Sequence, residues 1–517
     1  MKKKLNTHYK PLRVIAKGAS IIIIGLIIGK MLEFFSRVII ARFIGPGNFG
    51  LFSLGLSFFW IATNVSVMGF GYGVMRYVAY YKGRNNFNKI NDIISTAFKI
   101  VIFISILFFI TFLFFSNQIS LIFSDPKLSI ILQILSIGVP VYSFAIILFA
   151  IMKGLQTVKY KTLTEDLIRN FSAFSIVIIL LYLGYSTIGV TFAYLLSFII
   201  AAVISYYIVK KKLIQNINFI KKSPLSRELI TFSLPMSFSS ISSIIVRWAD
   251  TIVLGYYLTT AVVGIYNSAI LVASLLLVLD EALNCIFLPV TSELYSRNKL
   301  EDLKKVYKTS TRWIFLIIFP TFLMILFFPV HILSLLFGKK YIEASMPLII
   351  LSLGYTISLL FSLSTYVIIS LGKTKINFLV SLASLVTSIS LNILLVPVLG
   401  TNGAATATIS ALIIANLIPF IFTYKYIKVQ PFDLKYIKPF LAALTSMILI
   451  YAPLSYFKIE VSRFDLFIIF PAFILLYFFL LVIFKVLNEE DIMILRAVEK
   501  KTGIKIKCLD RIIKRFI

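Results

Sequence analysis

Charged residues are scarce in this chain. Aspartate and glutamate together number 21 among 517 residues, and all charged residues make up only 14%. Hydrophobic residues make up 59%, and the mean hydropathy is +0.97. A soluble domain carries about 25% charged and about 45–50% apolar residues. Roughly three soluble domains would be expected at this length, and the polar residues are too few to cover them. A soluble enzyme, a disordered chain and a secreted disulfide scaffold are therefore excluded.

Cysteine and histidine are almost absent. Cys285 falls in an apolar run and Cys508 in a basic tail, so their spacing gives neither a disulfide framework nor a metal site. The two histidines, His8 and His331, cannot assemble a catalytic centre or a metal centre. No phosphate-binding loop and no nucleophile–base set on an outer loop is present. The sequence therefore predicts no cofactor, no metal and no enzymatic activity.

Long apolar runs are abundant. We find about fourteen segments near 20 residues long, which is the length that crosses about 30 Å of hydrocarbon. These runs are continuous and rich in Ile, Leu and Phe, whereas a β-barrel shows short alternating segments. The predicted fold class is an all-α polytopic membrane protein. The expected spans are 18–40, 49–73, 93–115, 129–152, 166–184, 187–209, 230–255, 263–289, 313–336, 346–370, 377–398, 403–424, 439–457 and 466–485.

The net charge of +30 fits a membrane topology better than nucleic-acid binding. The basic residues lie between the apolar runs, not in one patch or on one helix face. Cytoplasmic termini would place most of the 51 lysines and arginines in cytoplasmic loops and tails. We therefore expect a multi-pass protein of the cell membrane with both termini cytoplasmic. Membrane lipids are its first expected partners, and nucleic acid is not a partner.

The first twelve spans predict an internal repeat. Gly50 and Gly189 recur as Gly264 and Gly403, each 214 residues further along the chain. Six spans is an even number, so both copies have the same orientation and form a parallel repeat. Such repeats place a substrate site between the two lobes. The expected organisation is an N-terminal six-helix lobe (1–209), a cytoplasmic linker (210–228), a C-terminal six-helix lobe (229–427), helices 13–14 (428–487) and a cytoplasmic amphipathic tail (488–517).

Ionisable residues inside spans are costly, so each is a site hypothesis by default. Lys30, Glu33 and Arg37 lie within about 60° of arc on the first helix, and Arg247 and Asp250 share a face of the seventh. The offset of the repeat makes Glu33 in the first copy equivalent to Arg247 in the second. We expect these five residues to bind substrate in a cavity of cationic character. The alternative is that Lys30–Glu33 and Arg247–Asp250 are ion pairs that lock helices together.

Two further acidic residues, Asp280 and Glu281, lie toward the inner end of the eighth span. They are candidates for proton or cation coupling, and the alternative is a hydrated helix end. Lys99 and Arg169 lie near cytoplasmic helix ends, where we expect their side chains to extend toward the membrane surface.

The region from Arg37 to Tyr81 contains a distinctive pattern. It has Arg42, Phe43, Gly45 and Pro46 before Gly50–Phe52, then Gly69–Gly71 and Arg76 with Tyr77. This pattern resembles the start of polysaccharide flippases in the multidrug/oligosaccharidyl-lipid/polysaccharide exporter superfamily. The tail that begins at Asn488 is similar to the tails of archaeal and bacterial members.

This resemblance implies a function. Members export a polyprenyl-phosphate-linked oligosaccharide from the inner to the outer leaflet by alternating access, for cell-surface polysaccharide or glycan biosynthesis. Cationic residues in a central cavity hold the phosphate-sugar headgroup, and Arg37 and Lys30 match that role by position. The resemblance also implies the polyprenyl-linked glycan as substrate and glycan-assembly enzymes as partners.

Two other functions stay open. The first is a cation-coupled multidrug antiporter of the same fold, which needs an anionic cavity. The cations Lys30, Arg37 and Arg247 argue against this function, whereas the carboxylate of Asp250 favours it. A membrane glycan polymerase or glycosyltransferase needs acidic residues or a sizeable loop outside, and the outer loops are short.

Overall fold

The computed structural model describes residues 10–213, 226–457, 459 and 461–486, and within these ranges the chain is helical with no strand. Nine of the described helices are long and apolar enough to cross a membrane, and a shorter apolar helix runs over Thr260–Leu276. The predicted class, an all-α polytopic membrane protein, is confirmed. The fourteen spans stay a prediction, and the predicted tail (488–517) lies outside the described residues.

Two of the long helices are each two spans joined at a glycine. Helix α2 (Lys10–Val67) bends at Gly45, whose φ of 76° and ψ of 171° are not helical. Helix α15 (Thr374–Ile427) bends at Gly400, where φ is 56° and ψ is −130°. Glycine adopts such positive φ angles without the steric cost that a Cβ imposes. Pro46 then starts the second half of α2, where its missing N–H removes no hydrogen bond.

Three further expected spans contain a break. The second span ends at Val67 and resumes after Gly69 as α3, Phe70–Gly83. The fifth combines a π-helix, Thr162–Ile168, with α7, Arg169–Tyr182. The eighth consists of α10 (Thr260–Ala273), a short 3₁₀ turn and α11 (Leu277–Ser296).

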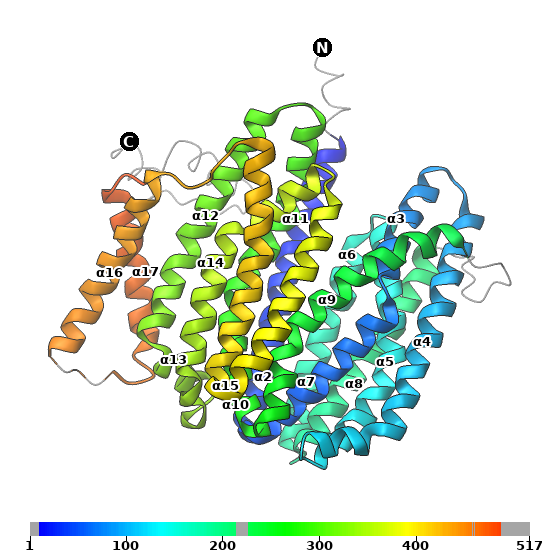
Figure 1. Ribbon diagram of the computed structural model, residues 1–517, viewed down its shortest axis with the longest axis horizontal. Coiled ribbons are helices and arrows are strands. Elements are labelled where there is room, and N and C mark those ends of the chain that lie inside the picture. The colour runs from blue at the N-terminus through cyan, green and yellow to red at the C-terminus, as the bar shows by residue number, and fades with distance from the viewer. Residues whose placement is uncertain (1–9, 214–225, 458, 460, 487–517) are drawn as a thin grey trace.

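The other helices follow the expected order along the chain. They are α4 (Phe87–Ile122), α5 (Lys127–Gly154), α6 (Val158–Lys161), α8 (Thr187–Ile208), α9 (Arg227–Tyr257), α12 (Leu300–Phe327), α13 (Pro329–Leu336), α14 (Ser345–Ser370), α16 (Ile437–Tyr456) and α17 (Leu466–Ile483). Helices α3 to α8 gather on one side of the molecule in Figure 1, and α10 to α15 gather on the other, with α16 and α17 beyond them. The first half of α2 runs through the middle and its second half runs toward α3, so we count α2 with the first group.

The bundle has two ends. The start of α2 and the end of α17 lie at one end, which we call the terminal side, and the bends at Gly45 and Gly400 lie at the other, the kink side (Figure 1). Helix α9 connects the two groups of helices. Its first half packs on α3, where Gly73 approaches the Ser233 hydroxyl, and its second half packs on α2, α10 and α15.

Candidate functional site

The two groups of helices meet tightly on the kink side. Gly50 and Gly264, the first glycine pair of the predicted repeat, lie directly against each other. A Cβ on Gly50 would fall inside contact distance of the Thr260 carbonyl oxygen and 2.8 Å from the Gly264 nitrogen. The absence of side chains at both positions therefore lets α2 and α10 cross at backbone contact.

Hydrogen bonds reinforce this closure. The Thr260 hydroxyl donates to the Asp125 carboxylate over 3.4 Å, and the Tyr341 hydroxyl donates to the Ala41 carbonyl over 2.6 Å. Arg42 of the predicted motif donates to the Leu335 carbonyl over 3.1 Å. Each bond joins the first group of helices to the second, with Asp125 in the turn between α4 and α5, so the kink side is closed.

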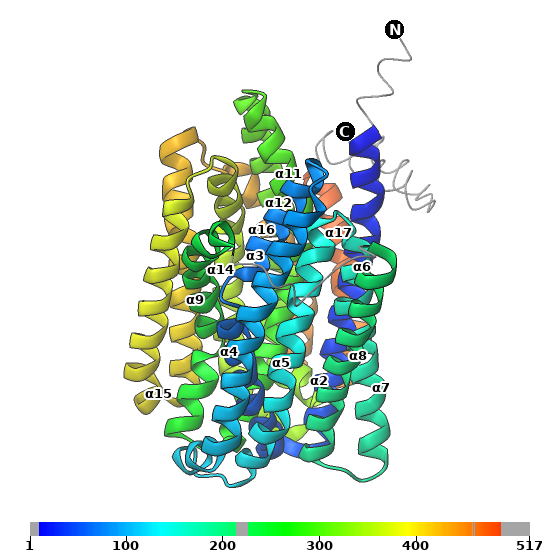
Figure 2. The same ribbon diagram turned by 90° about the vertical axis from the view of Figure 1, so that its right-hand side faces the viewer.

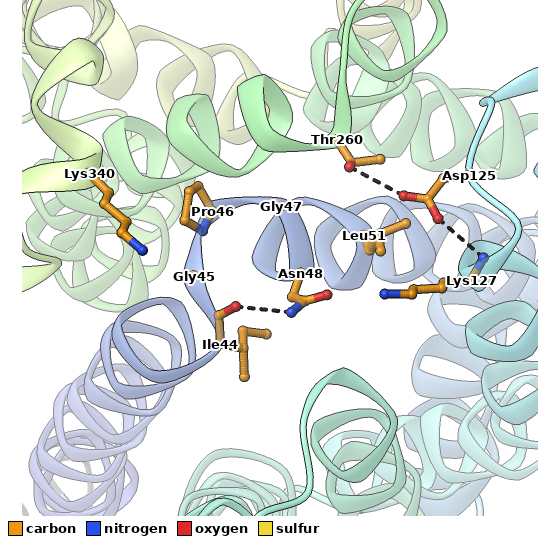
Figure 3. A pocket seen from close by; sticks show the side chains of 10 residues that line it. All are labelled: Ile44, Gly45, Pro46, Gly47, Asn48, Leu51, Asp125, Lys127, Thr260 and Lys340. Carbon is orange, nitrogen blue, oxygen red and sulfur yellow. Dashed lines mark hydrogen bonds between the residues drawn. The ribbon is translucent and has the colours of Figure 1, made fainter.

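A polar pocket of about 340 Å³ lies beside the closure, around the bend at Gly45 and Pro46. Figure 3 shows the side chains of Lys127 and Lys340 pointing toward its centre from opposite sides, with Asn48 between them. Motif residues Gly45 and Pro46 thus form the bend, and Gly50 forms the crossing.

The candidate residues Lys30, Glu33, Arg37 and Arg247 come together. Arg37 Nη2 lies 3.3 Å from Glu33 Oε1, one helical turn apart on α2. Lys30, Arg169 and Arg247 also lie close enough to the Glu33 carboxylate to interact with it electrostatically. Four cations therefore interact with one carboxylate, and we call these five residues the cationic cluster. It joins α2, α7 and α9.

Arg247 and Asp250 face different surroundings although they share about 60° of arc on α9. Arg247 is exposed and makes no hydrogen bond or ion pair with any described residue. Asp250 is only 1% exposed and accepts hydrogen bonds from the Tyr266 hydroxyl at 2.9 Å and the Thr408 hydroxyl at 3.1 Å. Asp250 is thus held inside the second group of helices, while Arg247 is exposed and lies within electrostatic reach of Glu33.

The predicted coupling residues also diverge. Asp280 accepts a hydrogen bond of 2.6 Å from Ser362 on α14. Glu281 instead reaches across to α2, where its Oε1 lies 3.4 Å from Lys30 Nζ, and the two side chains are 42% and 37% exposed. The alternative ion pairs Lys30–Glu33 and Arg247–Asp250 are wrong, because the partners formed are Lys30–Glu281 and Arg37–Glu33.

One important residue was misplaced by sequence reasoning. Arg169 does not extend to the membrane surface: its side chain donates to Asn170 over 2.9 Å and lies about 6 Å from the rings of Trp60 and Tyr142. It lines a cavity of about 10 Å³, which is room for about one water molecule, together with Glu33 and Arg37. Its position near a helix end was misleading, because the side chain contacts groups inside the first group of helices.

The motif residue Arg76 lies away from this cluster. Its guanidinium group stacks 4.4 Å above the Phe232 ring of α9. This cation–π contact is one of several that hold the first half of α9 on α3. Arg76 therefore supports helix packing.

Among the described residues, no group of His, Cys, Asp and Glu side chains is arranged to hold a metal ion.

Two family models match the chain. The model described as "Polysaccharide biosynthesis protein" matches residues 15–295, and the model described as "MatE" matches residues 235–394. The first match contains the whole cationic cluster and the kink-side crossing.

Curated relatives are similar over different shares of their length. An uncharacterized membrane protein of Methanocaldococcus jannaschii is 25% identical over 84% of this chain and 88% of its own. A putative O-antigen transporter of Shigella flexneri is 24% identical over 74% of this chain and 92% of its own. A probable low-salt glycan biosynthesis flippase of Haloferax volcanii is 29% identical over 35% of this chain and 39% of its own.

Solved structures share the fold. The lipid II flippase MurJ in an inward closed conformation superposes with a TM-score of 0.70 at 19% identity, over 89% of this chain and 98% of its own. A multidrug resistance MATE family transporter in an inward-facing conformation gives a TM-score of 0.66 at 16% identity, over 77% and 94%. At these identities the likeness concerns the fold.

Proposed function

The chain belongs to the polysaccharide biosynthesis protein family, and we propose that it is a flippase that carries a lipid-linked oligosaccharide across the membrane. The observation that carries this proposal is the cationic cluster. Four cations in it interact electrostatically with Glu33, one of them (Lys30) is paired with Glu281, and its member Arg247 has no ion-pair partner among the described residues. Charged side chains in the middle of a span are retained for function. The excess positive charge suits an anionic headgroup.

The substrate we propose is a polyprenyl-phosphate-linked glycan. A phosphate group cannot cross hydrocarbon bare, because burying an isolated charge is prohibitive. Arg37 and Arg247 come from helices that meet on the kink side and would hold the phosphate between them. The polyprenyl chain stays in the bilayer while the headgroup moves. An inside-negative potential then favours export by about 2.3 kcal/mol per negative charge per 100 mV.

We propose that the terminal side is cytoplasmic, since Lys210, Lys211 and Lys212 after α8 and the lysines in the first turns of α12 lie there (Figure 1). The closed kink side then makes the structure an inward-facing state. Transport requires the crossing at Gly50 and Gly264 to separate while the terminal side closes. We propose lobes at residues 1–209 and 229–427, related by the repeat, with α9 in contact with both. Glycan-assembly enzymes are the expected suppliers of substrate.

An ion-coupled mechanism has one favourable observation. Glu281 pairs with Lys30 across the two groups of helices, so separation of those helices would break this ion pair. A multidrug antiporter is the second candidate function, supported by the buried carboxylate of Asp250. Uptake of a cationic dye driven by a proton or sodium gradient, without movement of lipid-linked sugar, would favour it.

The decisive experiment is flipping in proteoliposomes. Purified protein is reconstituted with a labelled polyprenyl-linked oligosaccharide, and access to the label is followed with and without a membrane potential. We expect Arg247→Ala to reduce the rate at least tenfold, since removal of a charge that contacts phosphate costs about 1.5–3 kcal/mol. The matched control is Arg84→Ala, because Arg84 stacks on Tyr80 at the terminal end of α3, away from the cluster. Equal rates in the two variants would contradict the assignment.

A further inference from the structure

An apolar groove on the flank of the first group of helices takes no part in the proposed transport. It has a volume of about 500 Å³ and lies between α4, α5 and α8. Pro140 and Phe144 of α5 form its floor, Phe98 of α4 forms one wall, and Val203 and Tyr206 of α8 form the other. Figure 2 shows α5 between α4 and α8 on this face. We call it the flank groove.

The flank groove opens to the surrounding membrane. Val203 on its wall is 61% exposed, and Phe103 on the neighbouring α4 is also exposed. The wall on α8 extends from Ile199 to Tyr206, which is about 10 Å along the helix. Tyr206 lies near the last turn of α8, so the groove runs from the terminal-side membrane surface toward the middle of the bilayer.

The terminal-side end of the groove is cationic. Lys210 Nζ donates a hydrogen bond of 3.1 Å to the Tyr206 hydroxyl, which places an ammonium group directly at the groove mouth. Lys211, on the same short π-helix (Val209–Leu213), lies over the Tyr207 ring instead, away from the mouth. An apolar slot below the Lys210 ammonium group matches the shape of an anionic lipid, whose hydrocarbon chain hangs below a phosphate.

We propose that the flank groove binds an anionic phospholipid of the terminal-side leaflet, with one hydrocarbon chain in the slot and its phosphate on Lys210. This lipid is a resident of the membrane, not the transported molecule. The groove belongs to α4, α5 and α8, whereas the cationic cluster belongs to α2, α7 and α9. The proposal stands independently of which headgroup the protein moves.

Lipid retention by the purified full-length protein tests this. Native mass spectrometry compares bound phosphatidylglycerol with phosphatidylcholine of the same chain length. We expect preferential retention of phosphatidylglycerol, and we expect Val203→Trp, which fills the groove from its exposed side, to abolish it. The matched control is Leu196→Trp, two turns away on the same face of α8, 43% exposed and outside the groove lining.

The headgroup is tested separately. We expect Lys210→Gln to lower the preference for phosphatidylglycerol about fivefold, the effect of one basic residue near an anionic surface. The control Lys211→Gln removes a lysine that lies over the Tyr207 ring, not at the groove mouth. Equal retention of the two lipids, or binding by Val203→Trp at the wild-type level, would overturn the proposal. Displacement of phosphatidylglycerol by a polyprenyl phosphate would also overturn it, since the groove would then belong to the substrate path.

Discussion

The crossing of α2 and α10 at Gly50 and Gly264 gives the sharpest prediction about conformation. A Cβ at position 50 would overlap the Thr260 carbonyl and approach the Gly264 nitrogen to 2.8 Å. Both contacts are backbone atoms of helices, so neither can turn aside as a side chain would. Overpacking of this kind costs about 1–3 kcal/mol. We therefore expect Gly50→Ala to disfavour the closed kink side by about 5-fold to 150-fold in population.

The assay is a distance measurement across the closure. Spin labels on Lys127→Cys and Lys340→Cys, which border the kink-side pocket from the two groups of helices, report the separation by pulsed electron paramagnetic resonance. Gly50→Ala should add a population at longer distance. The control is Gly47→Ala, one turn earlier, where an added Cβ would meet nothing within 4 Å. An unchanged distance distribution in a folded Gly50→Ala protein would refute the reasoning.

Two further predictions concern the charges. Lys30→Glu should slow flipping of the lipid-linked oligosaccharide. Adding Glu281→Lys should restore part of the rate, because the ion pair reforms with reversed signs. The unfolding free energy should change by less than about 1 kcal/mol in either variant, since both side chains are partly exposed. Tyr266→Phe removes a 2.9 Å donor from the buried Asp250, so the protein should lose about 1.5–3 kcal/mol of stability in a denaturation assay. Tyr256→Phe, at a residue 58% exposed, is the control and should leave stability unchanged; an equal loss in both would show that the Asp250 hydrogen bond is not the cause.

Part of the candidate site could be predicted from local spacing. Glu33 and Arg37 are four residues apart, and a helix brings such residues together wherever it lies in a fold. The glycine pair Gly50 and Gly264 was also visible in the sequence as a repeat, although only the structure shows that its two members touch. The surroundings of Arg169 were predicted wrongly. Its distance from the end of an apolar run indicates how deep the residue lies in the membrane, but not the direction in which its side chain points.

The sequence by itself determined the class of protein and the helices that carry charge. Apolar runs specify spans because bare backbone and charge are costly in hydrocarbon. The bend at Gly45 and Pro46 emerged only from the structure. Only the tertiary structure decided the partner of each charge. Helical periodicity fixes which residues share a face, but the opposing surface comes from helices far along the chain. Lys30 therefore meets Glu281, and Arg247 is exposed while Asp250, one turn away, is buried.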